Sequence, residues 1–342
     1  MNAKEKLELI KRNTEEIVTE EELMKLLETK KEPAVYLGTA ITGRPHIAYF
    51  LWVLKLADFL KAGFKVKLLL ADLHGALDNT PWELLSKRYE YYSMVIPAMF
   101  KSIGADIKNF EIVKGSDFQK SEAYFYDLLK MSTVASQHDC KKAASEVVKQ
   151  SDNPKTSGLI YPMMQALDEE YLKVDIQYGG IDQRKILMFA REYLPKIGYK
   201  SRVEVMTPII PGLVGEKMSA SVEESKIDLL DSSEELMRKL NKAYCQECVV
   251  EGNGVFAFLK HVVMVVKQDQ SNEFVVERPE KYGGNLSYKT YEKLEKDYVE
   301  KKVHPQDVKT ALGKEIDRML EPVRKSMQGK EKLAKEAYPN SL

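Results

Sequence analysis

The stretch AVYLGTAITGRPHIAYFLWVLKLADFLKAGFKVKLLL, residues 34–70, decides the fold. Its first residues, 34–38, and its last, 65–70, are short apolar runs typical of buried strands. Between them lie a turn rich in threonine, glycine and proline, and an apolar stretch from about residue 46 to 62 that predicts a helix ending at Gly63. Two strands joined by a crossover helix predict a parallel sheet.

The same alternation continues along the chain. We expect helices over 81–103, 121–150 and 182–194, and strands over 110–114 and 174–178, the last broken by Gly179 and Gly180. The pattern predicts a Rossmann-like, doubly wound α/β domain over 1–228, with a helical insertion at about 121–157. The later patterns are helical, so we expect a second, α-helical domain over 229–342.

Composition places the chain among ordinary folded proteins. Hydrophobic residues make up 44% and charged residues 30%, which excludes the disordered class. The 52 lysines and arginines balance 52 acidic residues, so total charge neither indicates nor excludes a nucleic-acid partner. The apolar runs are too short for a membrane span and residues 1–12 are too charged for a signal peptide, which indicates the cytoplasm and no membrane partner.

The three cysteines, Cys140, Cys245 and Cys248, indicate a reduced protein without a disulfide framework. Cys245 and Cys248 form a CxxC motif, but no second cysteine or histidine pair follows at zinc-ligand spacing. We therefore predict no protein-bound metal.

A candidate phosphate-binding turn, TAITGRPHIAY, lies at 39–49 between the first strand and its helix. Small residues let the backbone approach a ligand, and the N-terminus of the following helix favours an anion. His46 is a candidate phosphate partner. A histidine that caps the helix after a proline turn is the alternative.

A second polar loop, GEKMSAS, lies at 215–221 and carries Lys217 among small hydroxyl residues. A lysine there can stabilise the charge that grows on a leaving pyrophosphate, because that interaction strengthens in the transition state. A solvated lysine on a surface turn is the alternative.

Together, in this order, the two segments resemble the HIGH and KMSKS signatures of class I aminoacyl-tRNA synthetases. Residues 46–49 keep only the first histidine of the one motif, and Ala220 stands where the other has its second lysine. The resemblance implies ATP as a substrate with Mg²⁺, and it makes His46 and Lys217 the catalytic residues that stabilise the phosphates. The implied ATP-binding residues are Thr42, Gly43, His46, Tyr49, Lys217, Met218, Ser219 and Ser221.

The segment 161–185 indicates the amino acid. Tyr161, Gln165 and Asp168 are spaced by four and three, so a helix presents them on one face. An amphipathic helix whose Gln and Asp are satisfied inside the protein is the alternative. The segment resembles the amino-acid pocket of archaeal and eukaryotic tyrosyl-tRNA synthetases. The resemblance implies contacts of Tyr36 and Asp168 with the phenolic hydroxyl of L-tyrosine, of Tyr161, Gln165 and Gln183 with its α-ammonium group, and of Gly38 with the ligand's backbone.

That family activates L-tyrosine with ATP to tyrosyl-adenylate and transfers it to the 3′-terminal adenosine of tRNA(Tyr), releasing AMP and pyrophosphate. The resemblance implies a homodimer formed through the insertion, and no DNA partner. A tryptophanyl-tRNA synthetase and a non-catalytic RNA-binding paralogue are the alternatives.

Segments 278–284 and 303–307 resemble the family's anticodon-reading region. A surface tyrosine and an aspartate capping the next helix are the alternative for this region. The implied tRNA-binding residues are Tyr282, His304, Pro305 and Asp307 for the anticodon, and Lys141, Lys142, Arg184 and Lys185 for the acceptor stem.

Overall fold

A largely parallel sheet forms the centre of the N-terminal region. The computed structural model describes residues 1–147, 155–212 and 226–339. The six strands are β1 (Glu16–Val18), β2 (Ala34–Thr39), β3 (Lys65–Leu70), β4 (Phe110–Lys114), β5 (Ile176–Gly180) and β6 (Val203–Thr207). Their order is β1-β6-β5-β2-β3-β4, and only β1 and β6 are antiparallel neighbours. The order therefore reverses between β2 and β5, which is where doubly wound sheets bind ligands.

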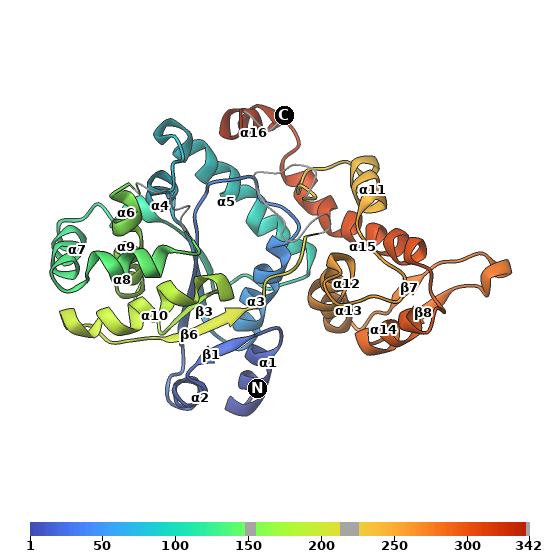
Figure 1. Ribbon diagram of the computed structural model, residues 1–342, viewed down its shortest axis with the longest axis horizontal. Helices are drawn as coiled ribbons and strands as arrows, with labels where there is room; N and C mark the ends of the chain where they lie inside the picture. Colours follow the sequence, from blue (N-terminus) through green and yellow to red (C-terminus); the bar gives the residue numbers. More distant parts are fainter. Residues whose placement is uncertain (148–154, 213–225, 340–342) are drawn as a thin grey trace.

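Helices cover both faces of this sheet (Figure 1). They are α1 (Ala3–Lys11), α2 (Glu20–Thr29), α3 (Tyr49–Lys61), α4 (Asp72–Leu77), α5 (Leu85–Ser102), α6 (Gly115–Phe118), α7 (Glu122–Val134), α8 (Gln137–Ala144), α9 (Ser157–Tyr171) and α10 (Arg184–Tyr193). Alternate residues of β2 separate the faces: Val35 and Leu37 pack in the cluster that contains α3 and α5, whereas Tyr36 packs in another. Tyr36 is thereby turned towards the face that α9 covers.

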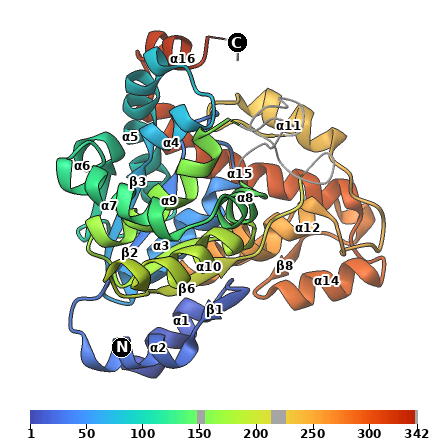
Figure 2. The same ribbon diagram turned by 60° about the vertical axis from the view of Figure 1, so that its left-hand side comes forward.

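The C-terminal region is mainly helical. Its elements are α11 (Ser233–Lys242), α12 (Gly254–Phe258), α13 (Met264–Asp269), β7 (Phe274–Val276), β8 (Leu286–Tyr288), α14 (Tyr291–Val299), α15 (Pro305–Ser326) and α16 (Glu331–Ala337). Both α15 and α16 pack against α5, and α16 lies beside α5 in both ribbon views (Figure 2). None of the helices in the described ranges combines the length and apolar character needed to cross a bilayer.

Several expected boundaries differ from the structure. The helix predicted from about residue 46 begins at Tyr49, because His46 instead forms an isolated bridge with Asp228. Gly179 and Gly180 do not break β5, since both pair with β6. The expected helix over 121–150 is divided at Ala135 into α7 and α8. The antiparallel hairpin of β7 and β8 was not predicted at all.

A row of buried polar side chains crosses the sheet on the α9 side. Tyr36, Gln177 and Glu204 are register partners on β2, β5 and β6, and Glu169 of α9 is fully buried above them. Among the described residues, none of the four carboxyl oxygens of Glu169 and Glu204 has a hydrogen-bond partner. Burial raises the pKa of both carboxyls, and each also raises the pKa of Tyr36. Because no donor in the described ranges meets either carboxyl, burial favours the protonated form of both groups.

We predict that Glu204→Gln reduces the loss of stability that accompanies a rise in pH above the ordinary glutamate pKa. A raised folded-state pKa makes stability fully present below the ordinary glutamate value and lost as the pH rises through the raised pKa. Between the ordinary and the raised pKa, each such group lowers the free energy of unfolding by about 1.4 kcal/mol per pH unit. Urea unfolding at a series of pH values measures the slope, and Glu111→Gln, at an exposed strand position, is the control. Equal slopes for Glu204→Gln and wild type would contradict the raised pKa of Glu204.

Candidate active site

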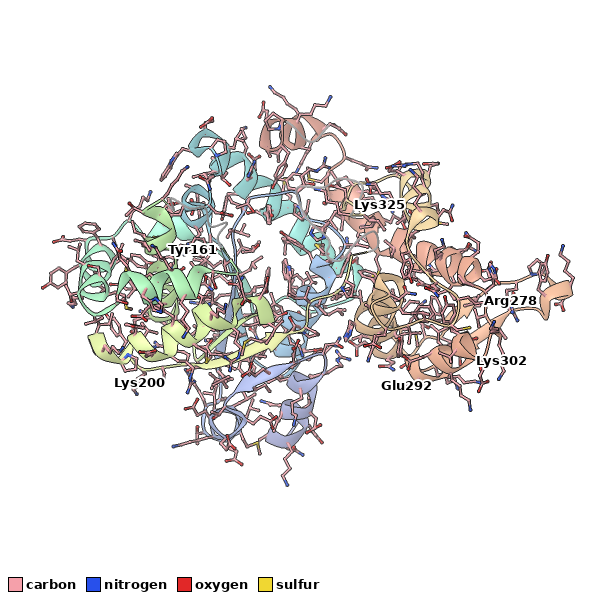
Figure 3. All side chains as sticks on the ribbon, in the orientation of Figure 1. Tyr161, Lys200, Arg278, Glu292, Lys302 and Lys325 are labelled. Carbon is pink, nitrogen blue, oxygen red and sulfur yellow. The ribbon has the colours of Figure 1, made fainter. Side chains whose placement is uncertain are left out.

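A cavity of about 230 Å³ lies at the carboxyl end of β2, beneath α9. The six residues predicted to bind the amino acid all line it: Tyr36, Gly38, Tyr161, Gln165, Asp168 and Gln183. Three of them come from one face of α9, as their spacing predicted. Tyr161 marks the cavity's position in Figure 3. The structure therefore brings together residues that lie far apart in the sequence.

Asp168 forms the polar end of this cavity. Its side chain is 1% exposed, and its Oδ1 accepts hydrogen bonds from Gln119 Nε2 and the Tyr124 hydroxyl, both at 2.8 Å. Burial raises the pKa of Asp168 to about 7, although these two donors lower it. His74 Nε2 lies 3.8 Å from Oδ2, beyond hydrogen-bond distance. Burial lowers the pKa of His74 to about 4, so its ring is neutral near pH 7.

Gln119, Tyr124 and His74 are site residues that the sequence-based list of candidates lacked. His74 follows the end of β3, a position that favours function but equally suits a packed histidine. Gln119 follows α6, and Tyr124 lies in the first turn of α7, neither within a recognisable motif. Only their convergence on Asp168 reveals them.

The other polar groups of the cavity lie close to one another. The Tyr36 hydroxyl donates to the Gln165 backbone carbonyl at 3.2 Å, and Gln165 Nε2 lies 3.4 Å from Gln183 Oε1. The ring of Tyr161 meets that of His74 edge-on, with centroids 4.6 Å apart. Two amides and two phenolic hydroxyls therefore surround the space beside Asp168.

The turn at 39–46 is held from behind by residues distant in sequence. Arg88 of α5 donates to the carbonyls of Ile41 and Thr42. The carbonyl of Gly43 accepts from the hydroxyls of Tyr92 at 2.7 Å and Tyr338 at 3.1 Å. The implied ATP-binding residues Thr42 and Gly43 thus lie in a braced loop, and Tyr49 joins them through its hydroxyl, 3.2 Å from that of Tyr92.

His46 lies at the end of this turn and is buried. Its Nδ1 has no hydrogen-bond partner in the described part of the chain, and burial together with Lys226 lowers its pKa to about 4. The helix-capping alternative is wrong, because Ala48 is the N-cap of α3. A neutral imidazole has one N–H donor and one nitrogen acceptor, so His46 can form a hydrogen bond with a ligand here.

Residues 226–228 run beside His46. Ile47 N donates to Ile227 O at 3.0 Å, and Arg44 pairs with Asp228 at 2.8 Å. Residues 213–225 lie outside the described residues, and with them the implied ATP-binding residues Lys217, Met218, Ser219 and Ser221. Residues 226–228, which follow that segment, therefore contact the turn at 39–46 and its end.

The predicted acceptor-stem residues lie at the surface. Arg184 forms a two-point pair with Glu16 at 2.7 and 2.9 Å, and Lys185 pairs with Glu146 at 2.8 Å. Lys141 and Lys142 are exposed in the last turn of α8.

The predicted anticodon residues lie on two adjoining segments. Tyr282 is 63% exposed in the turn between β7 and β8. Arg278 donates to the carbonyl of Gly284 at 3.1 Å and to that of Lys302 at 2.8 Å, which joins this turn to the start of α15 (Figure 3). The N-cap of α15 is His304, Pro305 follows it, and Asp307 lies in the first turn, so the alternative in which the aspartate caps this helix is wrong.

Comparison with known proteins identifies the family. The family model described as tRNA synthetases class I (W and Y) matches residues 28–321. The chain belongs to this family.

Within the described ranges, no group of three or more histidine, cysteine, aspartate or glutamate side chains is arranged to hold a metal ion.

Similar proteins include several tyrosine--tRNA ligases. The chain is 51% identical to the cytoplasmic enzyme of Gallus gallus over 98% of this chain and 64% of the relative, so it spans just under two thirds of that protein. It is 45% identical to the enzyme of Haloarcula marismortui over 99% of this chain and 98% of the relative. The tyrosyl-tRNA synthetase of Archaeoglobus fulgidus, solved in complex with L-tyrosine, has a TM-score of 0.88 and 40% identity, covering 95% of this chain and 100% of that one.

We predict that Tyr124→Phe raises the pKa of Asp168 further above about 7, because the lost O–H donor stabilises the ionised carboxylate. Carboxyl carbon chemical shifts followed by NMR during a pH titration report this pKa. Tyr171→Phe is the control, since the Tyr171 hydroxyl donates to Asp127 instead. The same Asp168 titration in wild type and Tyr124→Phe would contradict the assignment of this hydrogen bond.

Proposed function

We propose that the protein is a tyrosine-tRNA ligase, which activates L-tyrosine with ATP and transfers it to the 3′-terminal adenosine of tRNA(Tyr). The observation that carries this proposal is the cavity in which Asp168 and the Tyr36 hydroxyl lie near one another, with Gln165, Gln183 and Tyr161 beside them. A phenol donates to a carboxylate, and amide and hydroxyl oxygens accept from an ammonium group. L-Tyrosine satisfies both sets of groups at once.

The same groups favour tyrosine over phenylalanine and tryptophan. Phenylalanine would leave the buried carboxyl of Asp168 without a ligand partner, which costs the desolvation of a polar group. An indole offers one N–H donor and no acceptor, so it lacks the oxygen that would accept from the Tyr36 hydroxyl once that hydroxyl turns from the Gln165 carbonyl to the ligand. The alternative of a tryptophanyl-tRNA synthetase therefore fits this cavity less well.

In the proposed reaction the tyrosine carboxylate attacks the α-phosphorus of ATP in line and releases pyrophosphate. No protein nucleophile takes part, so catalysis depends on positioning and on electrostatic stabilisation. The braced turn at 39–46 holds the nucleotide, His46 offers a neutral N–H to a phosphate oxygen, and Lys217 stabilises the leaving pyrophosphate. The 2′-hydroxyl of the terminal adenosine then attacks the tyrosyl-adenylate, and AMP leaves.

Mg²⁺ is proposed to accompany ATP, because phosphate oxygens are the ligands that this ion prefers and it usually keeps several waters. This requires no dedicated metal site in the protein. The reaction is proposed to take place in the cytoplasm, as the names of the vertebrate relatives state for those proteins.

The tRNA is proposed to contact both parts of the chain, which divide near residue 228. Lys141, Lys142, Arg184 and Lys185 would meet acceptor-stem phosphates, and these contacts would be sensitive to salt. In the region 229–342, Tyr282 is exposed enough to stack on an unpaired anticodon base, while His304 and Asp307 at the start of α15 offer polar groups to base edges.

A homodimer is proposed to form through α7. Four large apolar or aromatic side chains on this helix are exposed: Phe125 by 59%, Tyr126 by 61%, Leu129 by 48% and Val134 by 37%. Exposed patches of this kind mark interaction surfaces. An isologous contact between two copies would bury the patch.

We predict that the protein exchanges pyrophosphate into ATP in the presence of L-tyrosine, and much less with phenylalanine or tryptophan. Asp168→Asn should lower kcat/KM for tyrosine about 10- to 100-fold, as expected when a hydrogen bond to a charged group is lost. Asp127→Asn is the matched control, because Asp127 is also buried beside two tyrosine hydroxyls but does not line the cavity. Exchange with tryptophan alone would reject the proposal, and RNA binding without any exchange would favour the non-catalytic paralogue.

We predict that Phe125→Asp combined with Leu129→Asp converts the dimer to a monomer, because two charges on each copy would be buried in the interface. Light scattering coupled to size-exclusion chromatography measures the mass. Tyr244→Asp, at an aromatic position 54% exposed in the C-terminal region, should remain dimeric. A wild-type monomer would contradict the proposed interface.

A further inference from the structure

The end of α1 is fixed on α3. The carbonyls of Ile10 and Arg12 accept hydrogen bonds from Lys55 Nζ of α3, at 2.7 Å for Ile10. The Lys55 side chain is only 1% exposed, and Asp58 lies 3.5 Å from its ammonium group. A lysine is buried at this cost only where its donors are used, and here they satisfy carbonyls that a helix end leaves unpaired.

The Arg12 guanidinium joins α3 to the C-terminal region. Its two Nη atoms donate to the Oδ atoms of Asp269 at 2.8 and 3.1 Å, and its Nε lies 3.4 Å from Asp58 Oδ2, with a further bond from Nη2 to Oδ1 of Asp58. Asp58 lies in α3 and Asp269 ends α13. The planar fork of an arginine can bridge two carboxylates in this way, whereas a lysine presents a single charge.

These groups are largely shielded from solvent. The Arg12 and Asp269 side chains are 24% and 23% exposed, and that of Asp58 is 3% exposed. Lys61 adds a second cation on Asp269 at 2.5 Å. The network therefore couples its members more strongly than isolated surface pairs, which contribute little.

The next residue makes a second connection between the same two parts. Asn13 Nδ2 donates to the His261 carbonyl, and Asn13 Oδ1 lies beside His261 Nδ1, both at 2.9 Å. Asn13 has a φ of 54°, a left-handed conformation that asparagine tolerates better than most residues. His261 lies in the π-helical turn Leu259–Val263, a type of turn frequent at functional positions.

The connected region leads directly to the proposed anticodon residues. Asp269 is followed by β7 at Phe274, and the turn with Arg278 and Tyr282 comes next. Figure 1 shows β7 and β8 leading away from the sheet, and Figure 3 places Arg278 far from Tyr161. A small rotation at α13 therefore moves the anticodon turn by a much larger distance than it moves α3.

We propose that Arg12 is a positioning residue for tRNA, which holds the C-terminal region at the angle that lets one tRNA reach both the anticodon turn and the cavity. The inference rests on the proposed function. Among the described residues, Arg12 has no hydrogen bond to a residue that lines the cavity or belongs to the 39–46 turn; it acts through Asp58 and Asp269. Its loss should therefore affect the charging of tRNA and leave the activation of tyrosine intact.

The test compares Arg12→Met with wild type in two assays. Pyrophosphate exchange should keep its kcat and its KM for tyrosine and ATP within about twofold, whereas KM for tRNA in aminoacylation should rise about tenfold, a typical coupling between distant sites. Asp269→Asn should give the same split, which excludes a direct contact of Arg12 with the tRNA. The rise in KM for tRNA in the double variant should be smaller than the product of the two single rises, because both changes break the Arg12–Asp269 pair.

Arg191→Met is the matched control. Arg191 forms a similar two-point pair with Glu22, at 2.9 and 3.1 Å, but it joins α10 to α2 within the first domain. It should leave KM for tRNA unchanged. Equal losses in exchange and charging for Arg12→Met, or no loss in either, would overturn the inference.

Hydrogen exchange distinguishes this failure from a failure of the proposed function. If wild type shows no tyrosine-dependent pyrophosphate exchange, the proposed function is rejected. The junction is then still tested by amide exchange of residues 259–276, which should be faster in Arg12→Met than in wild type or Arg191→Met. Unchanged amide exchange there would overturn the role of Arg12.

Discussion

The burial of the Asp168 carboxyl is the constraint on which the candidate site depends. A buried carboxyl needs donors, and here both come from outside the sheet, from Gln119 after α6 and Tyr124 in α7. The insertion that follows β4 is therefore part of the pocket as well as the proposed dimer surface. Both donors meet Oδ1, while His74, neutral near pH 7, lies beside Oδ2 without supplying a competing positive charge.

The turn at 39–46, where the nucleotide is proposed to bind, depends on distant parts of the chain in a comparable way. Its carbonyls at 41–43 are occupied by Arg88 and Tyr92 of α5 and by Tyr338 after α16. Since Tyr338 reaches this turn, the C-terminal region helps to shape the proposed nucleotide site in addition to its proposed role with tRNA. Because α15 and α16 pack on α5, the Tyr338 hydroxyl lies within hydrogen-bond distance of the turn.

The sequence predicted those parts of the candidate site that lie within one strand or one helix. The strand with Tyr36 and the helix with Tyr161, Gln165 and Asp168 follow from short-range periodicity, and the structure confirms both elements and their shared cavity. The position of His46 could not be predicted, because it depends on a bridge to Asp228 much later in the chain. Gln119 and Tyr124 were missed for the same reason: their roles exist only once the insertion has folded over α9.

Asp168 and Glu169 are consecutive residues of α9, and burial raises the pKa of both, but only Asp168 has hydrogen-bond donors in the described part of the chain. Asp168 faces the cavity and accepts from its two donors. Glu169 is instead buried near Glu204 of β6, and among the described residues neither glutamate has a hydrogen-bond donor. A charged Asp168 disfavours ionisation of Glu169, and ionisation of both would place like charges side by side in a region of low dielectric. A protonated Glu169 therefore makes it easier for Asp168 to carry its charge. Protonation of Glu169 and Glu204, neither of which lines the cavity, therefore limits the negative charge near Asp168.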